Sequence, residues 1–351
     1  MLNIHVLFEH NAHQQPHCMA YIRLLLPLTH PVNNGAFSVS HGCEYAPADI
    51  LIVERMWKPD LTLRQAEAVV ERSRQDRSCL IYTIDDNLLD LSTRDGSKGL
   101  FSSEKLMAVR YLARAADGII VSTEPLKHRL ARLNANIHVV PNALDERLCS
   151  VPAAPSRAVG GRKIIGYMGS HTHDADLMMI LQPLRELLRK YGDLIEFQIV
   201  GGIGDSALLQ ALAGLPVQVL EATASSDYPL FMPWMAENLR WDLAIAPLED
   251  TSFTACKSDI KALDYGVYGI PGIFSRVPAY ENTIRHLDTG WLAENDVASW
   301  QTAFETLLSD DQLRQRLGQN MQDYVRSTRI LQHCAPQWRE AIEAIYQGHR
   351  Q

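Results

Sequence analysis

The chain has 351 residues, 46% of them hydrophobic and 21% charged, which predicts a globular protein of two domains. Its formal net charge of -8 at pH 7 argues against a general nucleic-acid-binding surface. No stretch of the sequence approaches the roughly 20 consecutive apolar residues of a transmembrane helix, so we expect any membrane contact to be peripheral.

Short apolar runs alternate with segments of helical periodicity in the first half of the chain. This alternation is typical of an α/β protein with a parallel sheet. The first run lacks a preceding basic segment and predicts a strand, not a signal peptide. Strands are expected at residues 3–8, 50–53, 80–84, 118–122 and 137–140, and helices at 19–26, 61–74, 103–115 and 124–132.

A Pro- and Ala-rich stretch at residues 151–161 interrupts this pattern and is the best candidate for an interdomain linker. We therefore expect one domain at residues 1–155 and a second at 156–334. The last segment, residues 299–351, has helical periodicity. In the second half, strands are expected at residues 163–168, 195–200, 217–220 and 243–246, and helices at about 176–191 and 230–238.

Cysteine and histidine spacing gives little support for a metal site. The six cysteines are scattered without a C-x-x-C pair, which predicts reduced thiols in a cytoplasmic protein. His171 and His173 form an H-x-H pair, but zinc sites usually show more converging ligands. His10, His13 and His17 are irregularly spaced in the loop after the first expected strand. We expect no metal at the functional site.

The most informative stretch is residues 241–275, which predicts a buried strand, a polar loop and a helix. Lys257 and Ser258 lie where the loop enters the helix, and the unpaired N–H groups and dipole of a helix start favour phosphate. Asp264 follows two turns later and could accept hydrogen bonds from ribose hydroxyls. This combination suits a nucleotide diphosphate; the alternative is a solvated amphipathic helix followed by a turn.

A second informative pattern, residues 164–173, predicts a strand, a tight glycine loop and a helix. Gly169 has no side chain and would let the backbone approach a pyrophosphate closely. In the alternative interpretation, Ser170, Thr172 or Asp174 caps the helix that follows. The two interpretations are compatible.

Residues 257–275 resemble the donor-binding segment of GT-B glycosyltransferases, in particular the GT4-like group that builds bacterial surface polysaccharides. Residues 116–123 and 139–143 resemble two further segments of that family, so the resemblance covers nearly the whole chain. It implies two Rossmann-like domains facing across a cleft, with a C-terminal helix of about residues 335–351 packed on the first domain. The matching residues are Lys257-Ser258-Asp259-Ile260-Lys261, Asp264-Tyr265, Gly269-Ile270-Pro271 and Ser275, with Asp264 at the position of the family's glutamate.

The resemblance also implies that the donor is a nucleotide diphosphate sugar, with no cofactor and no metal in the site. Lys257 is expected to stabilise the negative charge of the leaving diphosphate. Lys261, one turn further on, is either a donor contact or a surface lysine. The expected donor-binding residues are Gly169, Ser170, His173, Gly201, Lys257, Ser258, Lys261 and Asp264.

Paired carboxylates close the strand expected at residues 80–84. Asp85 stands where many members of the resembled family have a histidine that faces the sugar. Asp85 or Asp86 could be a general base for the acceptor hydroxyl, or both could bind acceptor sugars or cap the next helix. Residues expected to bind the acceptor are His13, His17, Arg23 and Arg55.

The implied activity is transfer of a hexose or deoxyhexose to a glycan or lipid-linked acceptor in cell-surface polysaccharide or lipopolysaccharide synthesis. The expected location is the cytoplasm or the inner face of the cell membrane. The absent histidine motivates a second interpretation, a catalytically silent homologue that acts as a nucleotide-sugar-binding or scaffold subunit. A metal-dependent hydrolase using His171 and His173 is the third. The sequence leaves the sugar, base, acceptor, stereochemistry and oligomeric state open.

Overall fold

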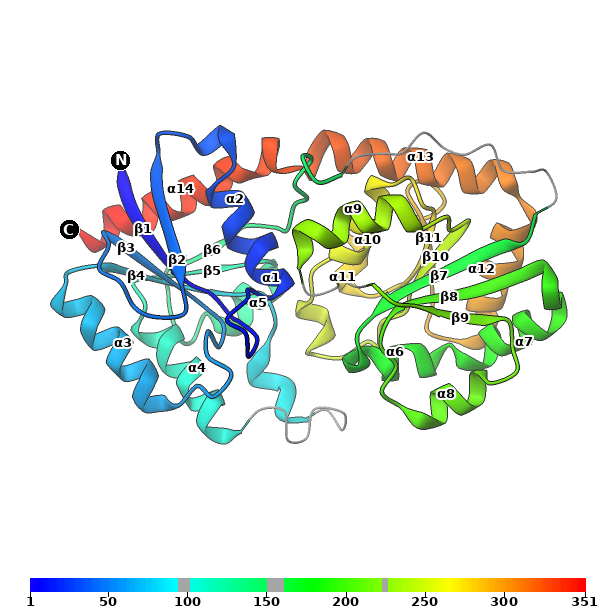
Figure 1. The fold of residues 1–351 in the computed structure, drawn as a ribbon, viewed down its shortest axis with the longest axis horizontal. Coiled ribbons are helices and arrows are strands. Elements are labelled where there is room, and N and C mark those ends of the chain that lie inside the picture. The colour runs from blue at the N-terminus through cyan, green and yellow to red at the C-terminus, as the bar shows by residue number, and fades with distance from the viewer. Residues whose placement is uncertain (94–101, 150–160, 223–226) are drawn as a thin grey trace.

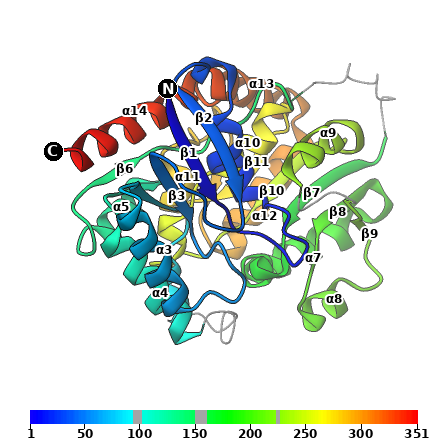
Figure 2. The same ribbon diagram turned by 60° about the vertical axis from the view of Figure 1, so that its left-hand side comes forward.

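The computed structural model describes residues 1–93, 102–149, 161–222 and 227–351, and these residues form two six-stranded sheets (Figures 1 and 2). Every strand pairing in both sheets is parallel. This confirms the expected α/β class, with helices beside both sheets. The expected domain boundary at residue 155 lies outside the described residues.

The first sheet has the strand order β2-β1-β3-β4-β5-β6. Strands β3, β4 and β5 are buried along their whole length, which explains why they appear in the sequence as continuous apolar runs. The edge strand β2 is mostly polar and partly exposed, so apolar periodicity did not predict it. The bounds are β1 Leu2–Leu7, β2 Phe37–Gly42, β3 Ile50–Glu54, β4 Cys79–Ile84, β5 Gly118–Val121 and β6 Ile137–Val139.

Side-chain caps define the starts of the helices around the first sheet. Thr62 and Gln65 form a capping box at the start of α3, and Ser102 and Thr123 cap α4 and α5. The helix expected at 19–26 is a mixed segment with a central π-helical turn, η1. The bounds are α1 Cys18–Ala20, η1 Tyr21–Leu25, α2 Leu26–Leu28, η2 Pro31–Asn33, α3 Leu63–Gln75, η3 Leu88–Thr93, α4 Ser103–Ala115 and α5 Glu124–Leu130.

The second sheet has the strand order β12-β11-β10-β7-β8-β9. Its bounds are β7 Lys163–Gly169, β8 Ile195–Gly201, β9 Val217–Leu220, β10 Leu243–Ala246, β11 Gly272–Ser275 and β12 Trp291–Ala293. The expected helix at 176–191 is broken at Ile180, which leaves the helical region of backbone space. The helices are η5 His171–His173, α6 Asp174–Met179, α7 Leu181–Tyr191, η6 Gly192–Leu194, α8 Ser206–Leu212, α9 Tyr228–Asn238, η7 Thr254–Cys256, α10 Ile260–Val267, α11 Pro278–Glu281 and α12 Val297–Ser309.

Two long helices carry the chain from the second sheet back to the first. Figure 1 shows α13 (Asp311–Thr328) and α14 (Leu331–His349) running along the same side of the molecule. Trp338, Ile342 and Ile345 of α14 are buried in the core of the first sheet. Gly118 makes room for this contact, because a Cβ there would lie 2.6 Å from Cγ1 of Ile345. Helix α14 therefore packs as part of the first half of the molecule, although it follows the second half in the sequence.

A buried polar cluster joins the two halves where the chain crosses between them. Arg329, between α13 and α14, donates from Nη2 to the carbonyl of Asn142 (2.8 Å) and to Oδ1 of Asp259 (2.9 Å). Asn142 in turn donates from Nδ2 to Oγ of Ser258 (2.9 Å). The cluster thus fixes the start of α10 relative to the first sheet. Among the described residues, no helix is both long and apolar enough to cross a membrane.

Candidate functional site

A cavity of about 550 Å³ lies between the two halves of the molecule. The residues around it follow the carboxyl ends of β7, β8 and β9, where ligands bind in open α/β sheets. Cys18, Met19 and Ile22 of the first half close the other side. The cavity brings together six of the expected donor-binding residues: Gly169, Ser170, His173, Gly201, Lys261 and Asp264.

The glycines at the ends of β7 and β8 set the close approach of the backbone at this cavity. Gly169 and Gly201 are paired across the two strands, and Gly201 has φ = 106°. A Cβ at Gly201 would lie only 2.1 Å from the carbonyl oxygen of Gly169. Both the backbone angle and the space therefore require glycine at position 201. The result is a cavity wall made of bare backbone.

His173 is held in a defined protonation state by its neighbours. Its Nδ1 lies 2.8 Å from Oδ2 of the fully buried Asp176, which also accepts from the backbone N–H of Glu249. The positive charge of Lys261, together with burial, lowers the pKa of His173 to about 4, although Asp176 acts in the opposite direction. The imidazole is therefore neutral near pH 7. Because Nδ1–H donates a hydrogen bond to the Asp176 carboxylate, Nε2 is left as a hydrogen-bond acceptor.

Asp264 and Lys261 are two ionisable groups of α10 with opposite perturbations. Asp264 is 5% exposed and accepts a hydrogen bond from the Tyr228 hydroxyl (3.0 Å). Burial raises the pKa of Asp264 to about 7. Burial lowers the pKa of Lys261 to about 8. Both groups therefore titrate close to neutral pH, as is common at functional sites.

A chain of ion pairs crosses between the halves beside the cavity. Lys257 Nζ lies 3.5 Å from Oδ1 of Asp86, and Arg55 Nη1 lies 3.2 Å from Oδ1 of Asp85 and 3.9 Å from Oδ2 of Asp86. Burial disfavours the charge on Asp86, but Lys257 and Arg55 outweigh it and lower the pKa. Asp86 is therefore an ionised carboxylate in this arrangement. The structure brings together Lys257, Asp85, Asp86 and Arg55, which the sequence analysis assigned to donor binding, catalysis and acceptor binding.

Two glutamates next to Arg55 were missed by the sequence analysis. Glu9 Oε2 lies 3.1 Å from Nε of Arg55, and the backbone N–H of Glu9 donates to Glu54 (2.8 Å). Glu54 is 1% exposed, and burial raises its pKa to about 8, so its carboxyl group is largely protonated near pH 7. Arg55 itself has φ = 41°, an uncommon backbone angle for a residue with a side chain. Both glutamates directly follow an apolar run in the sequence, and this pattern could have identified them as candidate site residues.

Four other residues expected at the site, His13, His17, Lys257 and Ser258, do not line the cavity. His13 is exposed and His17 is half-buried, in the loop that leads to α1. Ser258 accepts from Asn142 in the crossing cluster, and neither it nor Lys257 contacts the cavity directly. The Ser170 and Thr172 hydroxyls lie 2.7 Å apart.

Arg23 was expected to bind the acceptor, but the structure encloses its side chain within the protein. It is 2% exposed, donates to Oδ1 of Asn142 (2.9 Å), and its guanidinium lies 4.7 Å from the centre of the Trp338 ring. Burial lowers its pKa to about 10. A side chain enclosed in this way connects the end of β6 to α14 and is not presented to an acceptor.

The expected helix cap after Gly169 is also wrong. Helix α6 begins without a side-chain cap. Asp174 instead accepts from the backbone N–H groups of Gly204 (2.8 Å) and Asp205 (2.7 Å), and so ties the start of α6 to the loop after β8. The side chain of His171 lies outside the described part of the structure. Within that part, neither group of residues arranged to hold a metal contains His173.

Comparison with known proteins places this geometry in a known fold. No protein-family model matches the sequence, and no curated protein matches it significantly. HepE from Anabaena, solved with UDP and glucose, aligns over 98% of this chain and 100% of its own, with TM-score 0.68 and 14% identity. Sucrose-phosphate synthase from Thermosynechococcus elongatus aligns over 85% of this chain and 74% of its own (TM-score 0.65, 15% identity).

A glycosyltransferase from Rickettsia africae aligns over 99% of this chain and 98% of its own, with TM-score 0.62 and 11% identity. Such low identities establish the fold alone. The chain has the GT-B fold, with two Rossmann-like units, which confirms the expected fold class.

Proposed function

We propose that this chain is a glycosyltransferase that uses a nucleotide diphosphate sugar, with a UDP-hexose as the first candidate donor. The observation that carries the proposal is the convergence of Lys261, Asp264 and neutral His173 on one cavity at the carboxyl ends of the second sheet. HepE, which aligns along its whole length, was solved with UDP-glucose, and this supports the choice of base.

The cavity offers complementary groups for each part of such a donor. Bare backbone at Gly169 and Gly201 lets a diphosphate approach closely, and Lys261 supplies positive charge from the cavity wall. Lys257, which pairs with Asp86 beside the cavity, would supply further positive charge. Asp264 faces the cavity with a carboxyl group suited to the ribose hydroxyls. His173 would accept a hydrogen bond from a sugar hydroxyl through Nε2. Stabilisation of the leaving diphosphate by lysines requires no metal ion, so we propose metal-independent transfer.

Lys257 connects donor binding to the acceptor side. In this structure it pairs with Asp86, and a diphosphate, with its larger negative charge, would compete for the same ammonium group. Asp86 would then lose the cation that lowers its pKa most. A carboxylate with a higher pKa is a better general base, so donor binding would prepare Asp86 for the acceptor hydroxyl.

Asp86 is the stronger of the two candidates for this role. Asp85 is 8% exposed and forms the closer ion pair with Arg55. The acceptor would approach over Arg55 and the loop that contains His13 and His17. The acceptor class, a glycan or lipid-linked glycan of a surface polysaccharide at the inner face of the membrane, rests on the sequence resemblance.

The same ion pairs favour one alternative function. Both carboxylates are engaged by Arg55 or Lys257, and no histidine stands at the position of Asp85. A protein that binds the nucleotide sugar without transferring it, and acts as a scaffold subunit, would have these features.

A two-stage experiment separates the functions. Thermal stability is first measured with UDP-, GDP-, dTDP- and CMP-sugars, because a ligand that binds only the folded state raises stability. We expect UDP-sugars to raise the melting temperature most. Release of UDP is then measured with and without glycan acceptors, in the presence of a chelator.

The second stage distinguishes the proposals. UDP release that persists with a chelator supports metal-independent transfer, and loss of release in Asp86→Asn with retained UDP binding supports the general-base role. Binding with neither transfer nor hydrolysis would establish the scaffold function. No stabilisation by any of the nucleotide sugars would refute both.

A further inference from the structure

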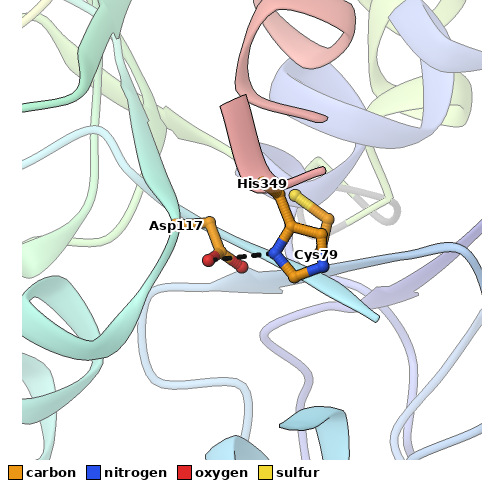
Figure 3. A group of neighbouring side chains, drawn as sticks. All are labelled: Cys79, Asp117 and His349. Atoms are coloured by element: carbon orange, nitrogen blue, oxygen red, sulfur yellow. Dashed lines mark ion pairs between the residues drawn. The ribbon is translucent and has the colours of Figure 1, made fainter. Parts of the chain in front are cut away.

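Cys79, Asp117 and His349 meet at the edge of the first sheet that lies away from the donor cavity (Figure 3). Cys79 is the first residue of β4, Asp117 directly precedes β5, and His349 is the last residue of α14. Asp85 follows the other end of β4, and a strand rise of about 3.3 Å per residue separates it from Cys79 by roughly 20 Å. The cluster is therefore a separate feature.

The ligand atoms of the three residues are close enough to share one ion. The Cys79 sulfur, an Asp117 oxygen and a His349 nitrogen all lie within 4.8 Å of one another. His349 Nδ1 and Asp117 Oδ1 are 3.1 Å apart. In a tetrahedral zinc site with bonds of about 2.0–2.2 Å, such a nitrogen and oxygen are separated by roughly 3.4 Å. Small side-chain shifts would convert the ion pair into a ligand set.

Neighbouring groups orient the Asp117 carboxylate and leave room for a water molecule beside the cluster. Asp117 accepts the backbone N–H of Leu80 through Oδ2 (2.7 Å), which leaves Oδ1 directed at His349. Such outer hydrogen bonds orient the ligands of metal sites. A cavity of about 300 Å³ lies beside Asp117 and His349 and has room for a water ligand. Arg74 and Arg77 also border it, but both are exposed, so solvent screens their charges.

We propose that Cys79 Sγ, Asp117 Oδ1 and His349 Nδ1 bind Zn²⁺, with water in the fourth position. A mixed sulfur, nitrogen and oxygen donor set suits this ion and disfavours Mg²⁺ and Ca²⁺, which prefer oxygen ligands. Binding requires the thiolate, so the Cys79 proton leaves to solvent as the Zn–S bond forms. The ion would fasten the end of α14 to β4 and β5. Its role is structural and independent of the proposed sugar transfer.

The test uses the full chain, stripped of metal with a chelator and then titrated with Co²⁺ as a spectroscopic probe. We expect one Co²⁺ per chain, with a thiolate-to-cobalt charge-transfer band and the visible bands of a tetrahedral site, both displaced by Zn²⁺. Cys79→Ser removes the charge-transfer band. Cys43→Ser, a half-buried thiol of the same half outside the cluster, is the matched control and keeps it.

His349→Ala gives a second test, because the side chain of His349 is partly exposed at the end of a helix and we expect its loss to leave the fold intact. Loss of a residue that only hydrogen-bonds to a metal ligand lowers metal affinity about 10- to 100-fold. Because His349 is a direct ligand, its loss should lower the affinity by more than roughly 100-fold. UDP should stabilise His349→Ala as it stabilises the wild type. The proposal is overturned if the wild type shows no charge-transfer band, or if Zn²⁺ raises the melting temperature of His349→Ala as much as that of the wild type.

Discussion

Lys257, His173 and Asp264 each have a protein partner whose interaction a donor would modify. Lys257 pairs with Asp86, His173 with Asp176, and Asp264 with the Tyr228 hydroxyl. Burial strengthens such interactions, and it shifts the pKa values of His173 and Asp264. At the scale of residues, donor recognition therefore depends on competition between ligand and protein partners.

Substitution of Lys257 tests this competition. A charge-assisted hydrogen bond contributes about 1.5–3 kcal/mol, so Lys257→Ala should weaken UDP binding roughly 10- to 150-fold in a calorimetric titration. Lys190→Ala is the matched control, because Lys190 is exposed, pairs with Glu305 of α12 and does not line the cavity. Equal UDP affinity in the two variants would remove Lys257 from the proposed site.

Substitution of Asp264 tests the cost of a buried carboxylate. An unfolded aspartate ionises near pH 3.8, whereas burial raises the pKa of Asp264 to about 7 in the folded state. Between these values the folded state keeps a proton that the unfolded state has lost, so wild-type stability falls as pH rises from about 4 to 7. Asp264→Asn removes this loss and still accepts from Tyr228.

The variant should therefore gain stability over the wild type between pH 5 and 7, by roughly 4 kcal/mol at pH 7, and the gain should level off above pH 7. Denaturant unfolding at several pH values measures it. The same variant should bind UDP more weakly. A stability difference independent of pH would show that Asp264 is ionised throughout.

Sequence patterns identified residue types at the site but not their partners. Arg23 and Arg55 are both arginines near the cleft edge of the first sheet, yet Arg23 is enclosed under Trp338 whereas Arg55 binds Glu9, Asp85 and Asp86. The difference arises from contacts with α14, more than 300 residues later in the chain. Periodicity along a short window carries no information on such a contact.

At the scale of elements, the strands buried on both faces were predictable, whereas two of the four edge strands, β2 and β12, were not. Strand β10 matches its expected range in full, because a continuous apolar run marks it. The edge strand β9 also matches its expected range, although Gln218 interrupts its apolar run and its residues are partly exposed. The edge strands β2 and β12 are polar or only three residues long. The break at Ile180 was not visible, because the helical periodicity continues through it.

The packing of α14 on β5 can be tested with a double-mutant cycle. Gly118→Ala places a Cβ against Ile345 and should cost about 1–3 kcal/mol through overpacking. Ile345→Ala leaves a cavity and should cost about 2–5 kcal/mol. In the double variant the added methyl partly fills that cavity, so the total cost should be smaller than the sum. Additive costs in thermal unfolding would contradict this contact.

At the scale of the whole molecule, the crossing cluster holds the two halves together. Arg329 contacts both the Asn142 carbonyl and the buried carboxylate of Asp259. Arg329→Met would leave Asp259 buried without its cation, and should cost about 3–5 kcal/mol in denaturant unfolding. Asp259→Asn in the same background should recover part of this loss. If it recovers nothing, the ion pair is not the source of the stability.

The central claim is that the cavity between the halves binds a nucleotide diphosphate sugar. The most direct measurement is a crystal structure of the chain with UDP-glucose at a concentration that saturates binding in solution. We predict the diphosphate within hydrogen-bonding distance of Lys257 or Lys261, with the ribose against Asp264. Nucleotide bound elsewhere, or a cavity closed by side chains in the saturated crystal, would contradict the claim.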